Sequence, residues 1–71
     1  MRKELAPHIV SDSEIRGGEP VIAGTRVPVR LILENLEAGH TFDEILENYP
    51  SLTRETIQAA LHWAAELTDA A

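Results

Sequence analysis

Residues 41–63 read TFDEILENYPSLTRETIQAALHW, a pattern that predicts two short helices joined by a tight turn. Thr41 is placed to cap the first helix, and Glu44, three residues later, completes a capping box. Apolar residues then recur at the helical spacing until Pro50 ends the helix. Thr53 is placed as the next cap, so the second helix begins almost at once.

A third helix is predicted just before this pair. Pro28 suits a first helical position, where a missing N–H costs nothing, and Gly39 suits the position just past a helix end. Helices this close must fold onto each other. The expected result is a helix-turn-helix-like unit of three helices over residues 28–67, followed by a frayed end at 68–71.

The first 27 residues predict extended chain and turns. His8–Val10 is β-prone, and the glycines at 17–18 and 24 indicate two tight turns. Nearby prolines each remove a hydrogen-bond donor, which restricts pairing to edges. The sequence therefore predicts a single, mainly α domain over residues 1–71, with a small N-terminal β arm (1–27) ahead of the three-helix unit.

Composition narrows the class of protein. Six Lys and Arg residues against 12 Asp and Glu give a formal charge of −6, which repels phosphate backbones. There is no cysteine, no signal peptide pattern and no run of the roughly 20 apolar residues that a membrane span requires. We expect a soluble, cytoplasmic protein with no membrane partner.

Two of the predicted helices carry a second apolar face. Leu31 and Asn35 point away from the inward stripe of the first helix at ~100° per residue. On the last helix, Ile57, Ala60, Leu61 and Ala64 form the expected inward stripe, and Trp63 lies off it. Such a face has to be covered by the β arm or by another subunit. We therefore predict a homodimer or higher oligomer, with a partner or oligomer interface at Leu31, Asn35, Ala59, Trp63 and Leu67.

No constellation for catalysis is visible. The three histidines lie far apart, there is no cysteine nucleophile, and no serine has a base at a suitable spacing. The glycine stretch at 17–26 lacks the Gly-Lys-Ser/Thr end of a phosphate loop. We expect no enzyme activity, no catalytic residues, no metal, no cofactor and no small-molecule substrate.

DNA reading by the last helix is a weaker possibility. Its first part offers Arg54, Gln58 and His62 as base or phosphate contacts. Glu55 and Glu66 lie on the same side, and Arg54 is the only Lys or Arg after residue 30. The basic cluster that supplies affinity for DNA is therefore missing.

Three segments together resemble a known family. Residues 17–29 read GGEPVIAGTRVPV, residues 36–39 read LEAG, and residues 45–53 read ILENYPSLT. They resemble the bacterial domain of unknown function 433 family over about residues 9–66. The resemblance implies a homeodomain-like helical unit behind a short β arm. It also implies an antitoxin of a type II toxin–antitoxin pair, with a cognate toxin as partner, often a small nuclease with an acidic, metal-binding PIN-like site.

Arg26 has two candidate roles. At the mouth of a tight turn it suits a structural clasp onto helix carbonyls or a carboxylate. If the resemblance holds, it also suits insertion among the metal-binding carboxylates of a toxin. The constrained turn favours the clasp, and both roles stay open.

Three functions follow as hypotheses. The leading one is a non-enzymatic antitoxin that neutralises a nuclease toxin and also contacts its own operator DNA. The second is a helix-turn-helix transcriptional regulator. The third is a plain homo-oligomerisation module.

Overall fold

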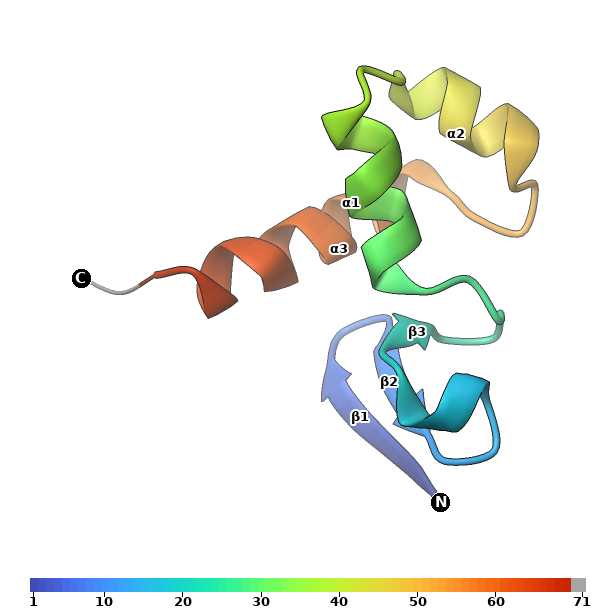
Figure 1. The fold of residues 1–71 in the computed structure, drawn as a ribbon, viewed down its shortest axis with the longest axis vertical. Coiled ribbons are helices and arrows are strands. Elements are labelled where there is room, and N and C mark those ends of the chain that lie inside the picture. The colour runs from blue at the N-terminus through green and yellow to red at the C-terminus, as the bar shows by residue number, and fades with distance from the viewer. Residues whose placement is uncertain (70–71) are drawn as a thin grey trace.

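A computed structural model describes residues 1–69 of the chain. Three strands come first and three helices follow, with the sheet at one end of the molecule and α1 rising from it (Figure 1). The elements are β1 (Arg2–Ala6), β2 (Ile9–Asp12), the 3-10 turn η1 (Arg16–Gly18), β3 (Val21–Ile22), α1 (Val29–Glu37), α2 (Phe42–Asn48) and α3 (Arg54–Leu67).

The strands form one antiparallel sheet in the order β1-β2-β3. Ile9 on β2 lies opposite Ile22 on β3, and Ala6 on β1 lies opposite Ile9. Two residues, Pro7 and His8, therefore make the whole connection between β1 and β2. His8 has a φ of +70°, a left-handed conformation that histidine tolerates better than most residues.

The predicted fold class was wrong. About 48% of the residues are helical and about 17% are in strands, and the N-terminal part is a three-stranded sheet rather than a small arm. Ile9, Val21 and Ile22 have at most 1% of their surface exposed, so the sheet supplies part of the core. The protein is an α+β domain.

The prolines did not prevent pairing because they lie beside the short ladder and keep their carbonyl acceptors. The Val29 N–H donates to the Pro20 carbonyl at 3.0 Å, and Pro28 forms a bridge to Val21. The sequence reasoning also missed β1, whose residues are largely exposed and carry no apolar run. Only its pairing with β2 defines it as a strand.

The three predicted helices are confirmed, although α1 begins at Val29 and Pro28, predicted as its first residue, is the N-cap in an extended conformation. Thr41 and Glu44 exchange hydrogen bonds as a capping box at the start of α2, with N–O distances of 2.8 and 3.2 Å. Thr53 caps α3, where Thr56 completes the box. Gly39 has a φ of +93° directly after α1, which is the left-handed helix end that glycine favours.

One core joins the sheet to all three helices. Leu52 and Ile57 flank the Thr53 cap and are both buried, as a hydrophobic staple requires. The buried cluster consists of Ile9, Ile22, Val29, Ile32, Ile45, Leu52, Ile57 and Ala60.

The predicted frayed end falls partly outside the described residues, since 70 and 71 are not described. Thr68 closes α3, and its hydroxyl donates to the carbonyls of Ala64 and Ala65 at 3.1 Å. Among the helices of residues 1–69, none has the length and apolar character needed to cross a membrane.

Candidate functional site

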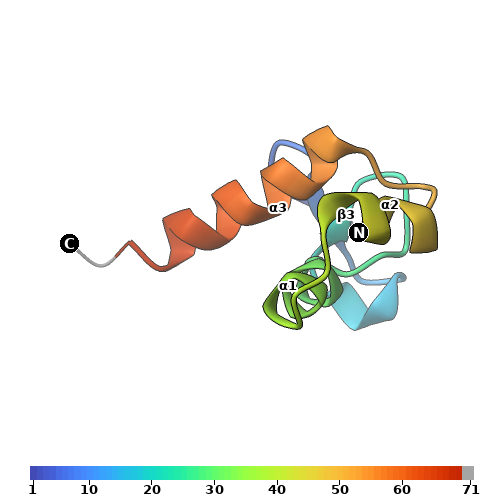
Figure 2. The same ribbon diagram turned by 90° about the horizontal axis from the view of Figure 1, so that it is seen from above.

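The core-facing side of α3 continues past the body of the protein. Figures 1 and 2 show α3 extending away from the sheet and the other two helices toward the C-terminus. Its apolar residues become uncovered in the same direction: Ile57 and Ala60 are fully buried, Trp63 and Ala64 are half-buried, and Leu67 is 66% exposed. We call these five residues the α3 stripe.

The α3 stripe differs from the one predicted. Leu61, which the spacing placed inward, is 38% exposed, whereas Trp63 packs against the core cluster. The residues at 60, 63, 64 and 67 share one side of a helix, and Leu61 lies off that side. Part of the apolar surface predicted at Trp63 is thus covered within the chain.

The two predicted interface residues on α1 are half-buried. The Asn35 side-chain amide donates to the Leu31 carbonyl at 2.8 Å, one turn back along the helix. Neither residue presents a large free apolar surface. Of the five predicted interface residues, Leu67 is the large apolar side chain left exposed.

The predicted DNA-contact residues do not form a basic reading head. The Arg54 guanidinium is hydrogen-bonded to Asp43 of α2 and lies 5.9 Å from the centre of the Phe42 ring. His62 is paired with Glu66 at 3.1 Å between Nε2 and Oε1. Gln58 is exposed beside them. The one cation of the helix start is therefore already engaged by a carboxylate.

Arg26 is exposed in the loop between β3 and α1, and its side chain has no hydrogen bond or ion pair with any residue in 1–69. The favoured structural clasp is therefore absent from that range. Thr25 closes this loop instead: its hydroxyl donates to the Ile22 carbonyl at 2.8 Å and accepts from the Val27 N–H at 3.0 Å.

An ion-pair cluster that sequence reasoning missed ties the η1 loop to α1. Glu19 accepts from Arg30 Nε at 2.8 Å and from Arg16 Nε at 3.2 Å, and Arg30 also reaches Glu34 at 3.0 Å. The Arg30 hydrogen bond, followed by that from Arg16, lowers the pKa of Glu19. Arg30 and Glu34 stand at the i, i+4 spacing at which helical side chains meet, whereas no local pattern brings Glu19 to Arg30.

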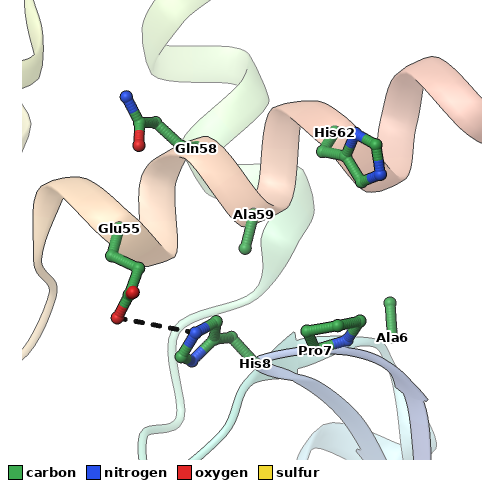
Figure 3. Close-up of a pocket in the computed structure, with 7 residues that line it drawn as sticks. All are labelled: Ala6, Pro7, His8, Glu55, Gln58, Ala59 and His62. Carbon is green, nitrogen blue, oxygen red and sulfur yellow. Dashed lines mark ion pairs between the residues drawn. The ribbon is translucent and has the colours of Figure 1, made fainter.

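A cavity of about 250 Å³ separates the β1–β2 connection from the first half of α3 (Figure 3). It gathers Gln58, Ala59 and His62 from the predicted sites with residues that no prediction included. At one end, Glu55 faces His8 with 3.6 Å between Oε1 and Nε2. The lining residues are Ala6, Pro7, His8, Glu55, Gln58, Ala59 and His62.

Within the part of the chain that the structure describes, no three His, Cys, Asp or Glu side chains are grouped so as to hold a metal ion. We therefore assign no metal site there.

Comparisons with known proteins agree on one family. The model of one protein family, described as a protein of unknown function (DUF433), matches residues 9–64 of this chain. The chain is 43% identical over 56 residues to the uncharacterized protein y4eO of Sinorhizobium fredii, covering 79% of this chain and 25% of that protein. It thus spans about a quarter of the length of the curated relative it matches.

A crystal structure of a DUF433 member protein from Anabaena variabilis is similar as well. The TM-score is 0.77 at 34% identity, over 83% of this chain and 58% of that one.

Proposed function

Since this chain belongs to the DUF433 family of proteins of unknown function, we propose that it is a non-enzymatic antitoxin that binds a cognate nuclease toxin of the PIN-like kind. The observation behind this proposal is the outer end of the α3 stripe, where Leu67 is 66% exposed on a helix that extends beyond the body. An apolar stripe on a projecting helix favours binding to another protein.

The outer end of the stripe is the part that a partner can reach. Ala60 is fully buried and Trp63 packs against the core, so Ala64 and Leu67, at the end of the same side of α3, are the residues that an apolar surface of the partner would cover. Covering a side chain such as Leu67 is worth roughly 1.5–3 kcal/mol. The formal charge of −6 adds attraction for a basic partner surface and speeds the encounter.

Co-expression tests this function. The chain carrying an affinity tag is produced together with the product of the adjacent reading frame, and growth and co-purification are measured. We expect a stable complex and relief of the growth defect that the neighbour causes when produced alone. A neighbour that neither binds nor becomes less toxic in the presence of this chain contradicts the proposal.

The remaining hypotheses are separated by two further measurements. A plain oligomerisation module gives a dimer or larger assembly by light scattering and no complex with the neighbour. A DNA-binding regulator shifts its own upstream DNA in a salt-dependent manner. We do not extend the proposal to operator DNA, because Arg54 is engaged by Asp43 and Glu55 flanks it.

A further inference from the structure

The cavity beside the β1–β2 connection has an apolar floor and an acidic end. Ala6 and Pro7 face Ala59 across it, and Figure 3 shows Glu55 reaching down from α3 to His8. The Gln58 amide points away from the β1–β2 connection in the same view. None of the residues lining the cavity is a lysine or an arginine.

The Glu55 carboxylate has one loose partner. His8 Nε2 lies 3.6 Å away, within ion-pair distance when the imidazole is protonated but too far for a hydrogen bond, and no other group in residues 1–69 donates to the carboxylate. At the other end of the cavity, His62 is paired with Glu66. A second carboxylate therefore lies near the rim, which disfavours a phosphate or another anion in this place.

We propose that this cavity receives an arginine side chain of the bound partner protein, with the guanidinium on Glu55 and the aliphatic stem over Pro7 and Ala59. A carboxylate matches the planar fork of a guanidinium with two parallel hydrogen bonds, and a lysine ammonium makes no such match. Long cationic side chains also lay their methylenes along apolar surfaces while the charge stays at a polar rim. The volume of about 250 Å³ has room for one such side chain.

The turn between β1 and β2 forms one wall of this cavity. His8 holds a positive φ there, as the second residue of the tight turn that follows Pro7 requires. The family model matches residues 9–64, so Ala6, Pro7 and His8 lie outside the matched range. One wall of the cavity thus comes from the family region and the other from the segment before it.

The inference rests on the proposed function in one respect, namely that the arginine comes from the bound partner. The cavity itself is tested without that partner, by titrating the isotopically labelled full chain with N-acetyl-arginine methylamide in NMR. We expect saturable shifts of the His8, Glu55 and Ala59 amides. The same titration with the capped lysine and with capped citrulline, which keeps the shape and lacks the charge, should give clearly weaker binding.

Two variants locate the contact. Glu55→Gln keeps the size of the side chain and removes its charge, and it should weaken binding of the arginine probe about two- to fivefold, as for an exposed ion pair. Glu14→Gln makes the same change at an exposed turn beyond the other end of β2 and should leave binding unchanged.

Three outcomes overturn the inference: no saturable shifts with the arginine probe, equal binding of citrulline, or equal binding by Glu55→Gln. A fourth outcome overturns the partner protein as the source of the arginine. If the cavity resonances move with protein concentration and Arg26→Gln stops this movement, the arginine comes from a second copy of the chain. If the chain binds the arginine probe but does not bind the toxin, the proposed function is contradicted and the cavity assignment stands.

Discussion

A carboxylate oxygen of Glu19 accepts a 2.8 Å hydrogen bond from Arg30 Nε, which ties the loop before β3 to the first turn of α1. The same carboxylate accepts from Arg16 within its own loop. The two guanidinium groups favour the charged form and lower the pKa of Glu19 below its ordinary value of 4.5. A carboxyl with a lowered pKa in the folded state contributes stability above its unfolded pKa and loses it as the pH falls through the folded value.

Replacing Glu19 with Gln should therefore lower the melting temperature near pH 7 and have a diminishing effect as the pH is taken toward 3. The measurement is thermal unfolding of both proteins across that range. Glu14→Gln is the control, because the side chain of Glu14 has no ion pair within residues 1–69. A difference between wild type and Glu19→Gln that stays constant across the range contradicts the assigned pairing.

The sheet should prove to be part of the folding unit. Ile9 is fully buried on β2, so Ile9→Ala should reduce the free energy of unfolding by about 2–4 kcal/mol. A domain of this size has a free energy of unfolding of only a few kcal/mol. The milder Ile9→Val, which should reduce it by about 1 kcal/mol, is therefore the safer variant in urea unfolding. Ile15→Val is the matched control, since Ile15 is half-buried outside the core cluster. If Ile9→Val and Ile15→Val reduce the free energy of unfolding by the same small amount, the sheet is not part of the folding unit.

The capping box at the start of α2 should be measurable on its own. Thr41→Ala removes the acceptor of the Glu44 N–H and should cost about 1 kcal/mol in chemical unfolding. Ser51→Ala, in the exposed turn between α2 and α3, should stay within about 0.5 kcal/mol of wild type. The cap would be energetically unimportant if both variants were equally stable.

The helices could be predicted because their signals are local. The caps Thr41 and Thr53 and the glycine Gly39 each define a helix end within a few residues of chain. The sheet could not be predicted with the same success, because β1 becomes a strand only through its partner β2. Its own residues are mostly polar, and strand formation depends on such pairing more than on local preference.

In the candidate site too, local features could be predicted and contacts between distant segments could not. The spacing identified apolar residues of α3 beyond those that the core needs. Leu67 is 66% exposed, and its place in an interface stays a prediction. Whether Leu61 or Trp63 faces the core depends on where the sheet and α1 pack. The helical period alone does not specify this. The cavity joins Pro7 and His8 to Glu55 across nearly fifty residues, a contact that no local pattern encodes.

The central claim is that the outer end of the α3 stripe binds the partner protein, and it is tested most directly by the affinity of two variants for the product of the adjacent reading frame. Leu67→Glu changes the stripe, and Leu61→Glu makes the same change about 120° around the same helix. We predict that Leu67→Glu weakens the complex at least about tenfold, or about 1.4 kcal/mol, and that Leu61→Glu binds like wild type. Equal affinity of Leu67→Glu and wild type, with both proteins folded, would contradict the claim.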